Sequence, residues 1–203
     1  MAYDSSWLSP SKVAGNGNDT VNFSAISSNT GRNARSTNVT FKAANCEDVV
    51  RTINQTGKPE FGTFSSSTAA STKTGGTLTL SGTSNSSALT FSLGTDNIGL
   101  TLPATYTAAG ASTNNGAAIS GDPGESAEYN WSIQFSIPEN TGVSALTTQV
   151  VVTDDAGHTN ICTITLAAGD ATLSVSSVSG DIPWDASSSV SVTVTSNTAW
   201  TVE

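Results

Sequence analysis

Alternation of apolar and polar residues with a period of two is the feature that most constrains this chain. Near the C-terminus, Val190, Val192 and Val194 alternate with Ser and Thr, which gives an extended segment one apolar and one polar face. Similar short runs recur along the 203 residues, and no apolar stripe of helical period persists. The pattern predicts an all-β fold built from antiparallel β-sandwiches.

An internal repeat organises the chain. Residues 23–57 and 135–169 both open with Phe-Ser and both place Asn-Thr-Gly before an alternating strand. The two triplets begin at Asn29 and Asn140, which lie 111 residues apart, and each copy ends in a further strand. A repeat of this length predicts two structural units of the same kind.

Each end of the chain carries only part of such a unit. Residues 1–60 hold the later strands and residues 170–203 the opening strands, so neither segment can close a core alone. Residues 75–169 are predicted to form an inserted Ig-like sandwich. The Ser/Thr/Ala-rich stretch 61–74 is predicted to be a linker or a poorly paired first strand, and the polar segment 108–127 a protruding or mobile loop. We therefore expect two Ig-like sandwiches, one of them split between the N- and C-terminal segments and completed in cis or by another copy.

Composition argues against several classes of function. The net charge is −9 with only seven Lys and Arg, which disfavours nucleic acids and anionic membranes as partners. No run approaches the roughly 20 apolar residues of a membrane span, so membrane insertion is not expected. The N-terminus has no signal-peptide pattern, so the chain is expected to be kept in a cytoplasm, assembled there into a virus particle, or cut from a longer exported protein. Of these, we favour a virion or an extracellular or cell-surface location. Cys46 and Cys162 fall in similar positions of different units, so we expect buried free thiols.

Read as 171–203 followed by 2–57, the chain resembles the BACON domain family, Ig-like modules of gut Bacteroidota and their phages. The matching positions are Val190-Ser191-Val192, Ser196-Asn197, Trp200-Thr201-Val202, Trp7-Leu8, Asn29-Thr30, Arg35, Thr37 and Gln55-Thr56-Gly57. The middle of the chain resembles the family more loosely. The resemblance implies a seven-stranded sandwich without catalytic activity that binds mucin-type glycans or proteins, or spaces other domains. It supplies no ligand residues.

Aromatic residues are the main candidates for binding. A Trp in a sandwich strand usually packs in the core, and we expect this of Trp131 and Trp200. If the two chain ends meet, an interface forms around four residues, because aromatic anchors dominate interfaces. These interface candidates are Trp200, Val202, Tyr3 and Trp7. Aromatic rings also stack on sugars, and the glycan-contact candidates are Trp7, Tyr3 and Trp184.

Polar candidates for chemistry are weaker. Two acidic clusters, Asp122 with Glu125 and Glu128, and Asp154-Asp155, lack the ligand spacing of a calcium loop and are predicted to be solvated. The lone His158 has no partner for a triad or a zinc site and is predicted to lie in a surface turn. We expect no catalytic residue, no metal and no cofactor.

Two functions remain open. The first is a structural assembly module of a phage virion or bacterial surface, whose half-sandwiches are completed by strand complementation within or between chains. Its partners would be other copies of itself or neighbouring virion or surface proteins. The alternative is a module that binds mucin-type glycans or a host protein, excised from a larger surface protein.

Overall fold

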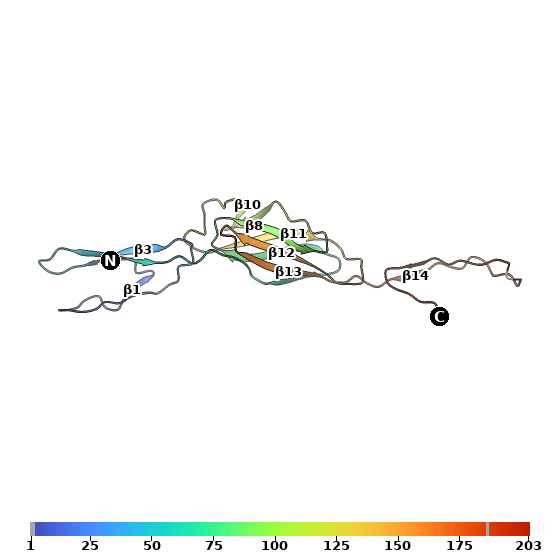
Figure 1. Cartoon of the computed structure of the whole chain (residues 1–203), viewed down its shortest axis with the longest axis horizontal. Helices are drawn as coiled ribbons and strands as arrows, with labels where there is room; N and C mark the ends of the chain where they lie inside the picture. The colour runs from blue at the N-terminus through green and yellow to red at the C-terminus, as the bar shows by residue number, and fades with distance from the viewer. Residues whose placement is uncertain (1–2, 186) are drawn as a thin grey trace.

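The computed structural model describes residues 3–185 and 187–203, which form an elongated molecule of three parts in a row (Figure 1). We call them the N-terminal segment (residues 3–57), the middle domain (61–169) and the C-terminal segment (170–203). The described residues form β-strands and no helix, which confirms the all-β prediction. None of them belongs to a helix that could span a membrane.

The middle domain is a sandwich of two sheets. The first sheet has the order β10–β9–β11–β7–β5 and the second the order β6–β13–β12–β8. The longest ladder joins β11 to β7 over nine antiparallel pairs. The strands are β5 (Gly62–Phe64), β6 (Thr68–Ser71), β7 (Gly76–Ser84), β8 (Leu89–Asp96), β9 (Thr105–Ala108), β10 (Ala111–Asn114), β11 (Tyr129–Ile137), β12 (Leu146–Asp154) and β13 (Thr159–Leu166).

Alternation along β11 and β12 builds the core of the middle domain. The odd-numbered residues of β11 are all buried, and the facing sheet contributes Val150, Val152 and Ile164, each fully buried. The indole of Trp131 is 2% exposed and meets the ring of Phe91 edge to face at 5.0 Å between centroids. Its predicted core position is therefore confirmed.

Residues 61–74 are not a linker. They carry β5, which pairs with β7 of the first sheet, and β6, which runs parallel to β13 of the second sheet. Short strands of small and hydroxylated residues give little apolar alternation, so backbone pairing with longer neighbours holds them in place. The segment 108–127 likewise folds onto the domain, since it contains β10 and the buried Ile119.

The N-terminal segment holds four strands in two separate pairs. β1 (Leu8–Pro10) pairs with β2 (Phe23–Ala25), and β3 (Arg35–Phe41) pairs with β4 (Val49–Gln55) over seven residues. Its small core consists of the buried Trp7, Leu8 and Val39. In the C-terminal segment, β14 (Leu173–Val175) pairs with β15 (Val194–Ser196), and none of the described residues from 171 to 203 is buried.

Candidate assembly interface

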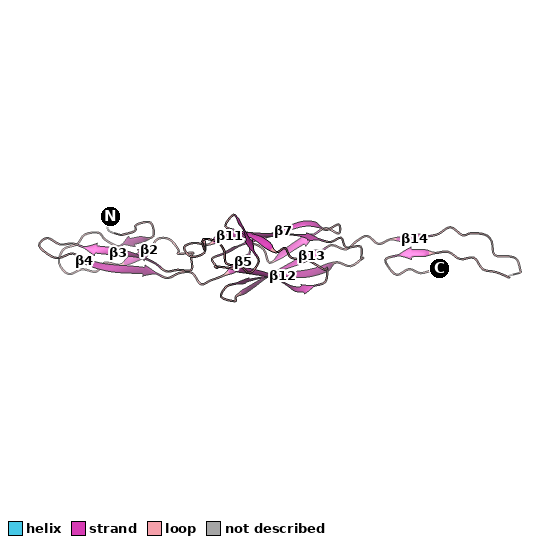
Figure 2. Cartoon of the chain, turned by 90° about the horizontal axis from the view of Figure 1, so that it is seen from above, coloured by secondary structure: helices cyan, strands magenta, loops and turns pink. Residues whose placement is uncertain are grey.

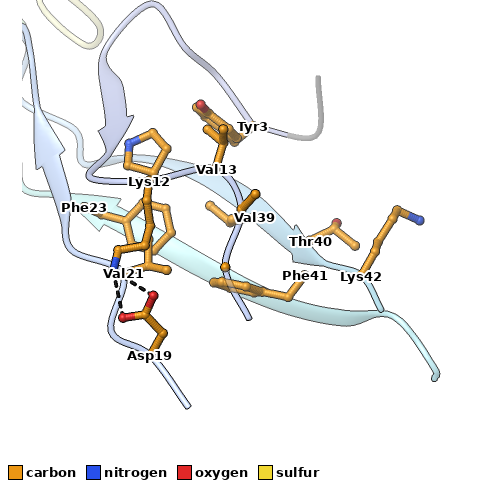
Figure 3. Close-up of a pocket in the computed structure, with 13 residues that line it drawn as sticks. Tyr3, Lys12, Val13, Asp19, Val21, Phe23, Val39, Thr40, Phe41 and Lys42 are labelled. Carbon is orange, nitrogen blue, oxygen red and sulfur yellow. Dashed lines mark hydrogen bonds and ion pairs between the residues drawn. The ribbon is translucent and has the colours of Figure 1, made fainter. Parts of the chain in front are cut away.

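An apolar groove of about 410 Å³ lies between the two strand pairs of the N-terminal segment (Figure 3). Val21 and Phe23 line it from the β1–β2 pair, and Val39 and Phe41 line it from β3. The rings of Phe23 and Phe41 meet edge to face at 6.3 Å, and Phe41 remains 40% exposed. The groove is therefore the open side of a core that these four strands do not close. Below, it is called the N-terminal groove.

The strands beside this groove have free edges. In the described part of the chain, β2 pairs only with β1, and β3 and β4 pair only with each other. A strand edge without a partner presents backbone N–H and C=O groups to another strand. In the middle domain, the strands that correspond to β2, β3 and β4 are β11, β12 and β13, and each of these pairs with two neighbouring strands. Each of β2, β3 and β4 therefore has one neighbouring strand fewer than its counterpart.

The C-terminal segment has exposed apolar side chains that no other strand of the chain covers in the described residues. These side chains alternate with Ser and Thr along the chain. Two strands without a covered face are marginal by themselves in water. The exposed large apolar residues of this segment are Leu173, Val175, Val178, Ile182, Trp184, Val192, Trp200 and Val202.

The two incomplete segments lie at opposite ends of the molecule. Both views show the middle domain between them, with strands β1 to β4 at one end and β14 at the other (Figures 1 and 2). The structure therefore does not bring Trp200 or Val202 together with Tyr3 or Trp7 of the same chain. Completion in cis, one of the two arrangements expected from the sequence, is not what this structure shows.

Charge is also divided between the poles. Residues 1–60 carry six Lys and Arg and five Asp and Glu, whereas residues 170–203 carry four Asp and Glu and no Lys or Arg. Opposite charges on two surfaces accelerate their encounter and disfavour contacts between like surfaces. With a formal charge near +1, residues 1–60 do not repel the C-terminal segment, whereas two C-terminal segments at −4 each repel one another.

The C-terminal segment begins the way the middle domain begins. β5 pairs with β7 in the register Gly62 with Ser84 and Phe64 with Gly82, and β14 pairs with β15 in the register Leu173 with Ser196 and Val175 with Val194. The backbone bond from Ser65 N to Ser81 O, 2.8 Å, recurs as Ser176 N to Thr193 O, 2.9 Å. The first strand pair of the middle domain therefore recurs in the C-terminal segment, outside the two stretches that the sequence repeat relates.

The aromatic candidates differ in exposure. The side chain of Trp7 is 3% exposed and Arg35 lies over its ring at 5.0 Å, so the prediction of a sugar contact there is wrong. Tyr3 is half-buried against the core of the N-terminal segment and lines the groove. Trp200, expected in a core, is 50% exposed, because the strands that would cover it are absent from its pole. Trp184 is 97% exposed and Val202 84% exposed.

The acidic residues of the 122–128 loop form contacts between the N-terminal segment and the middle domain. Asp122 accepts hydrogen bonds from both Nη atoms of Arg32, Glu125 accepts from Asn33 Nδ2 at 2.9 Å, and Glu128 pairs with Lys58 at 2.9 Å. Glu125 and Glu128 are exposed, as predicted for a solvated loop, whereas Asp122 is half-buried against Arg32. No group of three possible metal ligands occurs among the described residues.

The remaining polar candidates lie outside the groove. His158 sits in a turn with its side chain 64% exposed, as predicted, and its Nδ1 lies 2.9 Å from the buried carboxylate of Asp154. Cys162 is a buried free thiol whose pKa is raised by burial. Cys46 is free as predicted but exposed, because it lies in the β3–β4 turn and not in a strand.

Comparison with known protein families identifies the N-terminal segment. Residues 2–56 match the family model BACON, described as "Putative binding domain, N-terminal". The N-terminal segment is therefore similar to a BACON domain. The match covers roughly a quarter of the chain and confirms the resemblance stated above for this part. The likeness of residues 171–203 to the opening strands of a BACON domain stays a prediction. A search of curated proteins gives no match.

Proposed function

We propose that this protein is a non-catalytic assembly module in which the C-terminal segment of one copy completes the N-terminal segment of the next. A single observation carries the proposal: an open apolar groove with free strand edges lies at one pole, and exposed alternating strands lie at the other. The exposed apolar strands at the C-terminal pole can cover the open groove at the N-terminal pole. The proposed location is a phage virion or a bacterial cell surface, where extended assemblies of this kind have a use.

The driving force is the burial of apolar side chains together with backbone pairing. Val192 is 45% and Trp200 50% exposed in the free chain. Full burial of one large apolar side chain contributes about 1.5–3 kcal/mol, so a few of them outweigh much of the entropy lost on association. Addition of a strand to a free edge also supplies main-chain hydrogen bonds.

The position of the poles determines the form of the assembly. A contact between the C-terminal pole of one copy and the N-terminal pole of the next is heterologous, so it leaves a free pole at each end. Such contacts form filaments, or rings where the rotation closes. The three parts lie in a row, which favours extended strings of sandwiches (Figure 1).

The test is size-exclusion chromatography with light scattering over a wide range of protein concentration. The wild-type chain is expected to give a ladder of multiples of 20.5 kDa that lengthens with concentration. Val192→Asp should abolish the ladder, because it places a charge in the apolar face. Thr193→Asp, on the opposite face of the same strand, is the matched control and should retain it. A wild-type chain that stays monomeric throughout would overturn the proposal.

One observation favours the alternative function. Trp184 is almost fully exposed, and an exposed indole is a surface on which a sugar ring can stack. Under this alternative, the chain is a module that binds mucin-type glycans or a host protein. A mucin-glycan array probed with the wild type and with Trp184→Ala separates the two functions. Binding lost in the variant supports the alternative, and an array without signal contradicts it.

A further inference from the structure

The free edge of β2 is defined by its backbone hydrogen bonds. Ser11 N donates to Asn22 O at 2.7 Å and Ile26 N donates to Trp7 O at 2.8 Å, so even-numbered residues face β1. Alternate residues of an antiparallel strand direct their backbone groups to opposite sides. The groups of Val21 and Phe23 therefore point to the free edge.

The free edge of the strand that contains β15 follows in the same way. Ser176 N donates to Thr193 O and Asn197 N donates to Thr172 O, so odd-numbered residues face β14. The backbone groups of Val190 and Val192 then point away from β14. In both segments, therefore, the backbone N–H and C=O groups at the free edge belong to residues whose side chains lie on the apolar face.

The middle domain shows how such strands pair. In the ladder of β11 with β7, Ile133 lies opposite Leu80, Gln134 opposite Thr79 and Phe135 opposite Leu78. The repeat relates Phe135-Ser136 to Phe23-Ser24, and the shared pairing register relates Ser84 to Ser196. Both relations shift the numbering by the same 112 residues. The ladder can therefore be transferred to the two incomplete segments without an insertion.

From this template we infer that the N-terminal groove receives residues 190–194 of a second copy as a strand antiparallel to β2. Val192 lies opposite Val21, Ser191 opposite Asn22 and Val190 opposite Phe23. This inference rests on the proposed function, and it adds the register. The free backbone groups agree with this register. On both strands, the N–H and C=O groups that point to the shared edge are those of the apolar residues, Val21 and Phe23 on one and Val190 and Val192 on the other.

The register accounts for the shape and lining of the groove. Val190 and Val192 enter it against Phe23, Val39 and Phe41, which line it now (Figure 3). Asn22 and Ser191 then lie side by side on the outer face, as Gln134 and Thr79 do in the middle domain, where the Gln134 amide donates to the Thr79 hydroxyl at 3.1 Å. A shift by one residue would turn the valines toward water.

The inference is tested by disulfide mapping between full-length chains. All chains carry Cys46→Ser, which removes the exposed thiol. One chain carries Asn22→Cys and the other Ser191→Cys, and the two are mixed under mild oxidation. Opposed residues without mutual backbone bonds have Cα atoms about 4.5 Å apart, within the range of a disulfide. A covalent dimer that is cleaved by reductant is expected.

Ser189→Cys and Thr193→Cys are the register controls, because they lie on the same outer face two residues away. A displacement of two residues along a strand moves the Cα by about 6.6 Å, so disulfide formation with Asn22→Cys should be at least tenfold slower. Two results would overturn the register and leave the proposed function standing. In both, light scattering shows assembly, but cross-linking is either faster at residue 189 or 193 than at 191 or absent at all three positions. Absence of assembly overturns both the register and the proposed function.

Discussion

Asn85 and Asn197 make matching hydrogen bonds, one before the first strand of the middle domain and the other before the first strand of the C-terminal segment. The Nδ2 of Asn85 donates to the carbonyl of Thr30 at 3.3 Å, and that of Asn197 donates to the carbonyl of Thr141 at 3.0 Å. In each case the Oδ1 accepts from the backbone N–H that precedes this first strand, Phe61 at 3.0 Å or Thr172 at 2.9 Å. One amide side chain therefore links one part of the molecule to the start of the next.

The two asparagines differ in burial, and this predicts different effects on stability. Asn85 is fully buried and Asn197 is exposed. Asn85→Ala leaves buried backbone groups without partners and should lower the free energy of unfolding of the middle domain by about 3 kcal/mol. Asn197→Ala exposes its former partners to water and should cost less than about 1 kcal/mol. Urea denaturation followed by tryptophan fluorescence measures both. Equal losses would contradict the assigned roles.

Gly82 of β7 is predicted to be intolerant of any side chain. A Cβ at this position would overlap the ring of Trp131 and the carbonyl of Thr63. Gly82→Ala should therefore lower the free energy of unfolding by about 1–3 kcal/mol, through displacement of a fully buried indole. Thr77→Ala, at an exposed position of the same strand, should change it by no more than about 0.5 kcal/mol. Thermal unfolding of the two variants gives the comparison, and a wild-type melting temperature for Gly82→Ala would show the site to be roomier than described.

Asp96 is predicted to make the stability of the middle domain depend on pH. Burial alone would raise the pKa of its carboxyl, but hydrogen bonds from Ile98 N, the Thr148 hydroxyl and Leu100 N outweigh it and lower the pKa. Since the folded-state pKa lies below the unfolded value, the contribution is present above the unfolded pKa. It is lost as the pH falls through the folded pKa.

The measurement is urea denaturation at pH 7 and at several acidic pH values. Asp96→Asn keeps one acceptor oxygen and should cost about 1 kcal/mol at pH 7. It should also flatten the acid limb of the stability profile relative to the wild type. If the free energy of unfolding of Asp96→Asn falls with pH as steeply as that of the wild type, the acid sensitivity comes from other carboxylates.

Arg32 is predicted to hold the N-terminal segment against the middle domain. Its Nη1 donates to Asn85 O at 2.7 Å and to Asp122 Oδ1 at 3.0 Å, and the pair with Asp122 raises the pKa of the guanidinium. The backbone N–H groups of Arg32 and Asn33 donate to carbonyls of the same loop. Arg32→Ala should accelerate hydrogen exchange of these two amides about tenfold or more, since charged hydrogen bonds contribute about 1.5–3 kcal/mol.

Lys42→Ala is the matched control for this exchange experiment. Lys42 forms an ion pair with Asp48 in the exposed turn between β3 and β4. Exposed pairs contribute little, so exchange at residues 32 and 33 should stay within about twofold of the wild type. If hydrogen exchange at residues 32 and 33 is unchanged in Arg32→Ala, the backbone contacts alone hold the N-terminal segment against the middle domain.

Several elements were predictable because a local pattern specifies them. The alternation along 129–137 and 146–154 requires strands with one buried face, and it placed Trp131 in the core. Residues 61–74 were predicted to be a linker or a poorly paired first strand, because the Ser, Thr and Ala there carry no alternation, and the structure places the short strands β5 and β6 in this stretch. Trp7, a candidate for the interface and for glycan contact, is buried by packing with Leu8 and Val39.

The sequence by itself determined the all-β class and the repeat of about 111 residues, because these follow from local periodicity and from comparison of one stretch with another. Only the tertiary structure decided that the middle domain separates the two segments, and that the N-terminal groove and the free edges of β2 and β15 lie at opposite poles. The physical reason is that the direction in which a chain leaves a sandwich depends on contacts distant in sequence, such as Asn85 with Thr30 and Arg32 with Asp122, which no local pattern encodes.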